Sequence, residues 1–322
     1  MTKHSALVVG YGSIARRHVE NLRACGASEI TVVRPSGRAA DAPKALRFVA
    51  GIEEGLASEP ECAVIASPSA AHIESLLPLL KAGVPCYVEK PVVISAVQVK
   101  QIRDASRESK VSMSGCNLRF LPSLRRMQKE IAGGAIGKPV RASLQAGQWL
   151  PDWRPARDYR ETYSAKAAQG GGVIFDLIHE IDAARWLLGD FDQVLAMGGK
   201  RSRLEIDAED VAAILLGRRG AGPVVAIGLD YVARQRVRRY EVIGDEGTLV
   251  WDLGASRLSL VTAKGERVLA KDAADFDVGA TYLRAMREFL DAVKEGKPAA
   301  PDLADGLAAA ELAIRAREAL RA

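Results

Sequence analysis

Residues 6–15 have the sequence ALVVGYGSIA, in which a short apolar run leads into a turn with two glycines and then into a helical pattern. The run is typical of a buried strand, because its four apolar residues end at a turn signal. Gly10 allows the tight turn, Gly12 lets the backbone approach a pyrophosphate, and Ala15 is small enough for the helix to pack on a sheet. A strand that ends at such a turn and opens a helix predicts a dinucleotide-binding site. Its phosphate contacts would be the N–H groups at the helix start, those of Gly12, Ser13 and Ile14.

The same alternation of strand and helix continues over the next hundred residues. Short strands separated by helices of ten or more residues predict βαβ units and a doubly wound parallel sheet of the Rossmann type. Ligands of such sheets bind at the carboxyl ends of the strands. The further strand-like runs are residues 30–33, 62–66, 85–88 and 111–114, and the helical segments are 71–81 and 95–108.

Beyond residue 137 the pattern changes to strands that follow one another. They are residues 140–146, 210–216, 223–231, 240–243 and 248–253, with the turn GDEG at 244–247 between the last two. One helix at 173–188 interrupts the series, and two helices close the chain. We therefore expect a dinucleotide-binding domain at 1–120 and a second domain of the α+β class at 121–322.

Composition excludes several classes of protein. The 322 residues include 45 Lys and Arg against 40 Asp and Glu, a net charge of +5 that is far from the basic stripe of a nucleic-acid binder. No apolar run approaches the roughly 18–20 residues of a membrane span, and the N-terminal residues have no signal-peptide pattern, so we expect a cytoplasmic protein. The four cysteines lie far apart without metal-ligand spacing, so buried thiols are expected and no metal site.

The end of the second strand bears on the choice of cofactor. An NAD-binding site usually has Asp or Glu there to accept hydrogen bonds from the ribose, but this chain has Arg34 in the segment VRPSGR at 33–38. An Arg can bond a 2′-phosphate through two N–H groups, whereas a carboxylate would repel it. The segment therefore favours NADP(H) through Arg34, Ser36 and Arg38, with NAD(H), or an ordinary solvated loop, as alternatives.

Two further segments carry residues suited to proton transfer. The sequence EKP at 89–91 follows a strand directly and puts Lys90 at its carboxyl end. The sequence GGGVIFDLIHEID at 170–182 starts with three glycines that can let backbone pass close to a ligand. Asp176, His179 and Asp182 follow at i, i+3 and i+6, and a His beside carboxylates can carry a proton near neutral pH. The structural alternatives are a salt bridge at the strand end for Lys90 and a bond to Glu180 or backbone for His179.

These motifs together resemble the glucose-fructose oxidoreductase / inositol dehydrogenase / MocA family of NAD(P)-dependent oxidoreductases. The resemblance spans nearly the whole chain and rests on five segments in order: GYGSIARRH (10–18), VIASPSAAH (64–72), EKP (89–91), SGCNLRF (114–120) and GGGVIFDLIHEID (170–182). It implies a Rossmann domain followed by a domain with a large open, mainly antiparallel sheet. That second domain would bind substrate and build homodimers or homotetramers.

The resemblance also implies roles for individual residues. Lys90 would lie near the nicotinamide and the reacting hydroxyl, His179 would be the general acid/base, and Asp176 would support both. Many family members have four residues from this Asp to the His, whereas here the separation is three, which leaves Asp182 as an alternative partner of His179. The remaining cofactor contacts implied are Ser67, Pro68, His72, Glu89 and Asn117, and Arg119 would face the substrate.

Two other segments are rich in arginine. The stretch at 149–163 mixes aromatic rings with arginines, a combination that suits a sugar or polyol; the alternative is an oligomer contact. Its candidate substrate contacts are Trp153, Arg154, Tyr159 and Tyr163. The run RQRVRR at 234–239 would place alternate arginines on one face of a strand, either in solvent or against a nucleotide-sugar phosphate.

The expected function is hydride transfer between NAD(P) and a secondary alcohol or ketone of a sugar, cyclitol or sugar nucleotide, with Lys90 and His179 as an acid/base pair. Hydride transfer from an alcohol needs one group to take the hydroxyl proton and another to stabilise charge on the oxygen. The alternatives are a reductase of a dihydrodiol or tetrapyrrole, and a non-catalytic NADP(H)-binding sensor. The expected partner is a small sugar-like molecule, with no nucleic acid and no membrane.

Overall fold

The computed structural model describes residues 5–106 and 111–320. The chain divides into two compact units, one of Met1–Cys116 with Tyr282–Ala310 and the other of Asn117–Thr281 with Glu311–Ala322. The predicted division at residue 120 differs from this grouping, because the chain returns to the first unit at Tyr282. Such a return depends on tertiary packing, and a prediction that cuts the chain at one position cannot include it.

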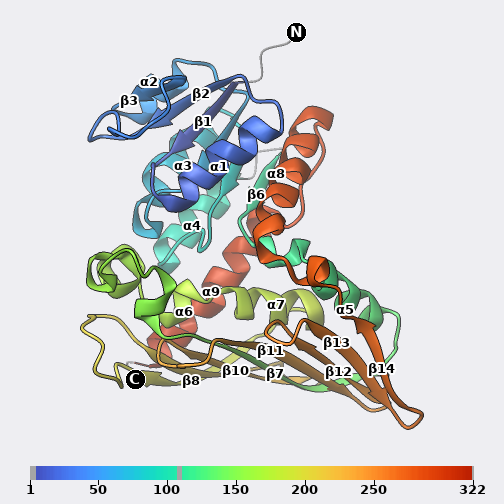
Figure 1. The fold of residues 1–322 in the computed structure, drawn as a ribbon. Coiled ribbons are helices and arrows are strands. Elements are labelled where there is room, and N and C mark those ends of the chain that lie inside the picture. The colour runs from blue at the N-terminus through green and yellow to red at the C-terminus, as the bar shows by residue number, and fades with distance from the viewer. Residues whose placement is uncertain (1–4, 107–110, 321–322) are drawn as a thin grey trace. The chain divides into compact units, whose positions relative to one another are not determined.

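The first unit contains a six-stranded parallel sheet in the order β3-β2-β1-β4-β5-β6 (Figure 1). Its strands are β1 (Ser5–Val9), β2 (Glu29–Val33), β3 (Leu46–Val49), β4 (Cys62–Ile65), β5 (Cys86–Val88) and β6 (Ser112–Ser114). Between them run the helices α1 (Ser13–Ala24), α2 (Ile52–Leu56), α3 (His72–Lys81) and α4 (Ala96–Ala105). The Rossmann prediction is confirmed, since the order reverses beside β1 as in a doubly wound sheet.

The apolar runs of the sequence form the centre of this sheet. Leu7, Val8, Val32 and Val64 are completely buried, since helices cover both faces of a parallel sheet. The sequence did not predict β3, because its residues LRFV are a run of only four positions, interrupted by Arg47, at the sheet edge.

The second unit contains an eight-stranded sheet in the order β14-β13-β12-β11-β7-β10-β9-β8. Neighbouring strands are antiparallel except for the central pair β7 and β10, which confirms the predicted mainly antiparallel sheet. The strands are β7 (Pro139–Gly147), β8 (Gln193–Gly199), β9 (Val211–Gly217), β10 (Val224–Asp230), β11 (Val237–Gly244), β12 (Gly247–Asp252), β13 (Arg257–Thr262) and β14 (Gly265–Ala270).

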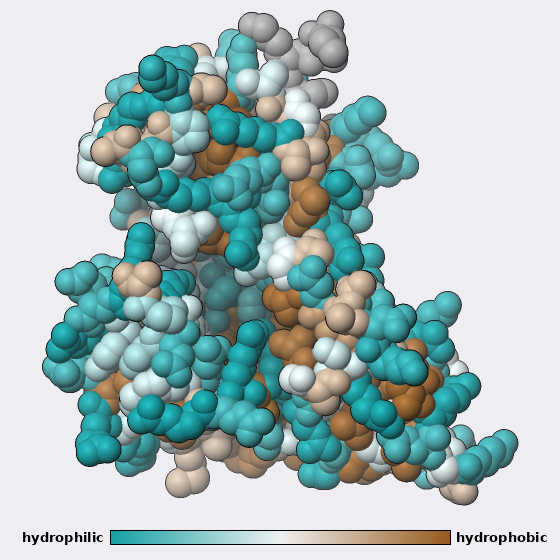
Figure 2. Space-filling model, in the orientation of Figure 1, coloured by the Kyte–Doolittle hydropathy of each residue, from teal (hydrophilic) through white to brown (hydrophobic). Residues whose placement is uncertain are grey.

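Helices cover one face of this second sheet. The helices α5 (Pro122–Ala132), α6 (Val173–Asp176) and α7 (His179–Leu188) lie on the buried side chains of its strands (Figure 1). The opposite face keeps exposed apolar side chains, and Figure 2 shows brown surface among teal over these strands. They include Leu195, Met197, Leu215 and Val224.

The last two helices are α8 (Val278–Glu295) and α9 (Leu303–Ala319). Within the described residues, no helix has the length and apolar character needed to cross a membrane. In that same part of the chain, no group of three or more His, Cys, Asp or Glu side chains is arranged to hold a metal ion. Three of the four cysteines are buried thiols and Cys25 is half-buried.

Candidate functional site

The start of α1 fits a phosphate. Gly12 is the N-cap residue, no side chain caps the helix, and the first turn has no acidic residue. A Cβ at Gly12 would meet no protein atom within 4 Å, so the missing side chain leaves space open to a ligand. Gly10 has a different role, since its φ is +92° and a Cβ there would lie 2.9 Å from the Ala66 carbonyl oxygen. The N–H groups of Ser13 and Ile14 therefore lie at a helix start that no side chain caps, where they can donate hydrogen bonds to the phosphates of a dinucleotide.

The loop after β4 adds a second feature that fits a cofactor. The Ser67 hydroxyl is buried and has no hydrogen-bond partner among the residues that the structure describes. Such a group is costly unless a ligand or water satisfies it. Pro68 beside it is exposed. The residues of this unit thus fit the predicted dinucleotide.

His72 supports this loop from within the protein. Its side chain is buried, with Nε2 2.9 Å from the Ser67 carbonyl oxygen and Nδ1 3.2 Å from that of Val92. Burial lowers the pKa of His72, although both carbonyls oppose the shift, so the ring is neutral and one nitrogen donates at a time. Predicted as a cofactor contact, His72 instead ties the loop that carries Ser67 to the segment after Lys90.

The loop after β2 holds the two arginines predicted to recognise a 2′-phosphate. Arg34 is half-buried and donates one hydrogen bond, of 3.0 Å, to the Gly37 carbonyl. Arg38 donates to the carbonyls of Leu46, Ala42 and Pro43 and lies over the Phe48 ring, so its guanidinium closes the loop on itself. Ser36 is exposed at the tip. Arg34 is therefore the better candidate of the two for a phosphate contact.

Lys90 follows β5, as the sequence predicted. Its side chain is half-buried, and its backbone N–H donates to Glu89 Oε2 at 3.2 Å. Glu89, predicted beside the cofactor ribose, is buried and accepts a hydrogen bond of 2.7 Å from His18 on α1. His18 was quoted in the first motif but not assigned a role.

The predicted helix at 173–188 is interrupted between Asp176 and His179. Helix α6 ends at Asp176, Leu177 leaves the helical region with φ −100° and ψ 33°, and α7 begins at His179. The rotation of about 100° per residue of a continuous helix therefore does not apply across this break. Because of this break, the three-residue spacing from Asp176 to His179 does not by itself turn the His179 side chain away from the direction that the four-residue spacing of the family would give it.

Asp176 is a buried carboxylate held by two phenols. Tyr163 donates from its hydroxyl to Oδ1, and Tyr231 donates to Oδ2 at 2.9 Å. Burial and then the Asp176 charge raise the pKa of both tyrosines well above the usual value, so both remain donors. Sequence reasoning missed Tyr231, which lies 55 residues from Asp176 and has no motif of its own.

Asp182 binds Arg119 through both oxygens. Arg119 Nε and Nη2 donate to Oδ2 and Oδ1 at 3.0 and 2.6 Å, and both side chains are largely buried. The two side chains therefore hold each other, and the predicted roles of Arg119 toward the substrate and of Asp182 toward His179 stay predictions. Glu180, considered as an alternative partner of His179, is fully buried, with the Tyr240 hydroxyl and Arg238 Nε each at 2.8 Å. Asn117, predicted to contact cofactor, donates a hydrogen bond to Thr281 Oγ1 at 2.6 Å.

Two of the three glycines before α6, Gly171 and Gly172, make room for the protein's own chain. A Cβ at Gly171 would overlap the carbonyl oxygens of Tyr163 and Lys166, and one at Gly172 would overlap the Glu209 carboxylate. Gly172 also has φ +105°. The expectation that this run approaches a ligand is therefore replaced by close packing within the second unit.

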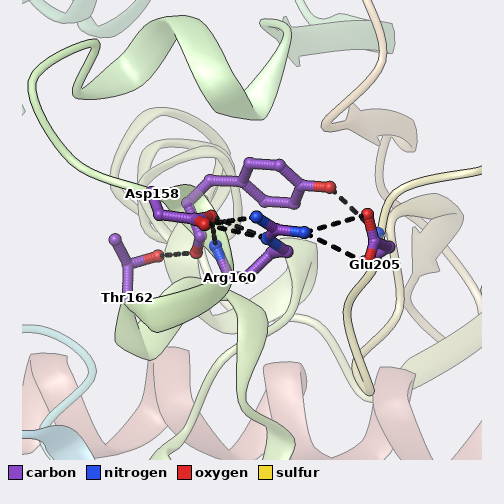
Figure 3. A network of polar contacts seen from close by, with 5 residues as sticks. Asp158, Arg160, Thr162 and Glu205 are labelled. Carbon is purple, nitrogen blue, oxygen red and sulfur yellow. Dashed lines mark hydrogen bonds and ion pairs between the residues drawn. The ribbon is translucent and has the colours of Figure 1, made fainter.

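The aromatic stretch borders a small hollow of about 10 Å³, roughly the space of one water molecule. Its lining consists of Leu150, Trp153, Arg154, Tyr159, Thr162 and Ser164, which include three of the four predicted substrate contacts. Arg154 lies over the Tyr163 ring at 5.6 Å, which links this hollow to the Asp176 cluster. Figure 3 shows how the stretch is held: Arg160 lies between Asp158 and Glu205, its guanidinium bonded to both.

The arginines at 234–239 do not form one face of a strand. Strand β11 starts only at Val237, and Arg234 lies over the Trp149 ring at 3.8 Å. Arg238 binds the buried Glu180 of α7. A carboxylate within the chain thus binds Arg238, one of the three alternate arginines that were considered for a phosphate.

Comparison with known proteins gives two matches to family models. Residues 5–115 match the oxidoreductase family with an NAD-binding Rossmann fold, and residues 124–250 match the GFO/IDH/MocA C-terminal domain. Myo-inositol 2-dehydrogenase of Thermotoga maritima is 24% identical, over 97% of this chain and 95% of its own. Inositol 2-dehydrogenase of Rubrobacter xylanophilus is 28% identical, over 98% and 90%. A levoglucosan dehydrogenase, solved in complex with NADH and L-sorbose, shares the fold with a TM-score of 0.85, at 19% identity over 99% and 97% of the two chains.

Proposed function

Since this chain belongs to the GFO/IDH/MocA family of oxidoreductases, we propose that it transfers a hydride between a nicotinamide cofactor and a secondary alcohol or ketone of an uncharged sugar or cyclitol. The observation that carries this proposal is the buried Asp176 carboxylate, held by Tyr163 and Tyr231 three residues before His179. Full-length relatives named inositol dehydrogenases support the substrate class.

The proposed chemistry assigns one role to the cofactor and others to three side chains. When bound, the nicotinamide supplies or accepts the hydride at the carbon that changes oxidation state. In the oxidation, His179 takes the hydroxyl proton while the Lys90 ammonium stabilises negative charge that develops on the oxygen. Asp176, oriented by hydrogen bonds from its two phenol donors, would stabilise the positive charge on His179 once the proton has been taken. The reduction uses the same groups in reverse.

Pairing of the arginines favours an uncharged substrate over a sugar nucleotide. Arg119 is bonded to Asp182, Arg238 to Glu180, and Arg160 to Asp158 and Glu205. A phosphate would have to compete with a carboxylate for each of these cations, at a cost that is large for the buried pairs of Arg119 and Arg238 and small for the exposed pair of Arg160. Besides Arg154, the side chains that line the small hollow at Trp153 are apolar, aromatic or hydroxyl-bearing, types that suit the C–H faces and hydroxyls of a polyol.

For the cofactor we propose NADP(H) over NAD(H), with Arg34 as the discriminating residue. Arg34 stands where an NAD-binding protein places a carboxylate, and its hydrogen bond from Nη1 to the Gly37 carbonyl leaves further N–H groups of the guanidinium for a phosphate. Equal or tighter binding of NADH than NADPH in a fluorescence titration would contradict this assignment.

The proposed function is tested by a substrate panel in the presence of NADP⁺ or NAD⁺. We expect turnover of inositols or neutral sugars and none of UDP-, GDP- or CMP-sugars at the same concentration. His179→Asn keeps a polar side chain of similar shape but cannot carry the proton, so it should lower kcat about 10²–10⁴-fold. The control is Asp158→Asn, which changes the exposed ion pair with Arg160 and should retain activity.

Two outcomes would contradict the proposal. Near-normal kcat in His179→Asn would remove the acid/base role and favour a reductase that does not use this residue. Tight cofactor binding without turnover of any panel member would favour the NADP(H)-binding sensor.

We further propose that the chain assembles through the open face of the second sheet. Leu195 and Met197 on β8 and Leu215 on β9 share that face and are 69%, 79% and 47% exposed. A contiguous exposed apolar surface of this kind is typical of an interaction site. A symmetric contact of two such faces would give a dimer, and a second contact a tetramer.

A further inference from the structure

His18 is a buried residue to which the proposed chemistry gives no role. It lies on α1, six residues after the N-cap Gly12, and its side chain is fully buried. Its Nε2 is 2.7 Å from Glu89 Oε1, a short and charge-assisted hydrogen bond. Because an ionised carboxylate can only accept, Nε2 carries the hydrogen and donates it.

Both oxygens of Glu89 are engaged, each with a different part of the first unit. Oε1 accepts from His18 on α1, and Oε2 accepts the backbone N–H of Lys90. Gly115 makes room behind the side chain, since a Cβ there would lie 3.0 Å from Glu89 Cα and 3.2 Å from Oε2. The Glu89 carboxylate therefore connects α1 to the backbone of Lys90.

The surroundings fix both partners. The His18 ring contacts Tyr87 of β5 on one side and Tyr282 of α8 on the other, with centroid separations of 5.0 and 6.3 Å. Burial alone would raise the pKa of Glu89, but the His18 hydrogen bond and the Lys90 charge lower it, so the carboxyl is ionised at neutral pH. A buried carboxylate that lost His18 would be without its strongest partner and would have to move or take up a proton.

We propose that His18 is a positioning residue that, through Glu89, fixes the backbone of Lys90 relative to the end of α1 that would hold the cofactor phosphates. The inference rests on the proposed role of Lys90. Six residues of helix separate His18 from Gly12, a rigid distance of about 9 Å. A group that acts on the reacting oxygen must be held within a fraction of an ångström of its place relative to the bound cofactor. The His18–Glu89 hydrogen bond links α1 directly to the segment that carries Lys90, so the relative position of the two does not depend on the intervening strand β4.

The first test compares His18→Phe with His18→Gln. Phenylalanine keeps the ring between Tyr87 and Tyr282 but has no donor, whereas glutamine retains an N–H for Glu89. We expect His18→Phe to lower kcat about 10–100-fold with little change in substrate KM or cofactor Kd, as misplacement of a catalytic group predicts, and His18→Gln to restore most of the loss. Unchanged kcat in His18→Phe, or an equal loss in both variants, overturns the inference.

The second test asks whether His18 acts through Lys90. In a double-mutant cycle, His18→Phe should cost activity in the wild-type background and almost none in Lys90→Ala, because the group it positions is gone. Additive losses would point to a general structural role and overturn the inference. Tyr87→Phe is the matched control: it keeps the ring beside His18 and removes only a buried hydroxyl without a partner among the described residues, so activity should be retained.

The third test does not depend on turnover. Backbone amide exchange of the peptide that contains Lys90 should accelerate in His18→Phe and in Glu89→Gln, while peptides from β2 and α3 keep their wild-type rates. Unchanged exchange at Lys90 overturns the positioning role even if the proposed oxidoreductase activity is correct. If no substrate is turned over but exchange accelerates as expected, the positioning role stands and the proposed function fails.

Discussion

Gly12 of the first motif and Gly172 of the run before α6 have different functions, and the space around each glycine distinguishes them. An added Cβ at Gly12 would have no protein atom within 4 Å, and the φ of Gly12 is an ordinary −75°. At Gly172 it would overlap the Glu209 carboxylate in a backbone with φ +105°. One glycine leaves room for a ligand, and the other leaves room for the protein itself.

The first prediction compares Gly12→Ala with Gly172→Ala. Gly12→Ala should keep the wild-type free energy of unfolding but weaken cofactor binding about tenfold or more, since the backbone can no longer approach the pyrophosphate. Gly172→Ala should lose about 2–4 kcal/mol of stability from strain and overlap. Urea denaturation and cofactor titration measure the two effects. A Gly12→Ala protein that binds cofactor normally would contradict the assignment of this turn.

Asp210 provides a prediction about pH. It is buried and, although burial opposes the shift, bonds from Ser202 and Arg201 lower its pKa. A lowered folded-state pKa means that the carboxylate stabilises the fold above its unfolded pKa of about 3.9, and that this contribution is lost as pH falls through the folded value. Asp210→Asn should therefore lower the Tm clearly at pH 7 and less at pH 3.

The control for that experiment is Asp272→Asn, which changes an exposed carboxylate. It should leave the Tm within about a degree of wild type at pH 7, as surface changes usually do. If the Asp210→Asn deficit were as large at pH 3 as at pH 7, the loss would come from packing and not from the charge.

At the level of elements, α7 is anchored by two carboxylates that follow His179. Glu180 binds Arg238 and Tyr240 of β11, and Asp182 binds Arg119 before α5. These two pairs therefore fix the rotation of α7 about its own axis relative to the sheet. The position of His179, at the start of α7, is fixed with it. Buried pairs of this kind specify an arrangement more than they add net stability.

The neighbouring residues Arg238 and Arg239 offer a matched comparison on β11. Arg238→Met leaves the fully buried Glu180 without its cation and should cost about 3–5 kcal/mol. Arg239→Met removes an exposed pair with Glu241 at 3.5 Å and should stay within about 0.5 kcal/mol. Chemical denaturation of both variants checks the difference. Equal losses would show that the Glu180 pair does not anchor the helix.

At the scale of the whole molecule, each unit has its own sheet and its own candidate residues. The first contains the helix end at Gly12 and the turn with Lys90, and the second contains Asp176 and His179. Asp176 and His179 lie in the helices that cover one face of the eight-stranded sheet, and its open face is the surface that we propose for assembly.

The assembly prediction concerns this open face. The double variant Leu195→Asp with Met197→Asp should reduce the molar mass measured by light scattering, because two charges would be buried in an apolar contact. Val97→Asp on α4 is the control, a side chain 69% exposed outside that sheet, and should leave the mass unchanged. A wild-type protein that is monomeric at high micromolar concentration would contradict the proposal.

Much of the fold could be predicted because its signals are local. The turn at 10–12 and the strands β4 and β5 follow from short apolar runs and turn residues next to each other in the chain. The break of the helix at Leu177 and the position of the short edge strand β3 could not, since neighbouring elements decide them. For the candidate site, residue types at 89–91 and 176–182 were visible in the sequence, but their hydrogen-bond partners were not.

The sequence by itself determined where a dinucleotide turn, a lysine at a strand end and a histidine beside carboxylates lie along the chain, because each depends on residues within one turn of one another. Only the tertiary structure decided the partners: Tyr231 for Asp176 across 55 residues, Arg119 for Asp182 across 63, and His18 for Glu89 across 71. A buried carboxylate must find a donor, and many distant side chains could provide it chemically. Which one does so follows from the sheets that bring them together.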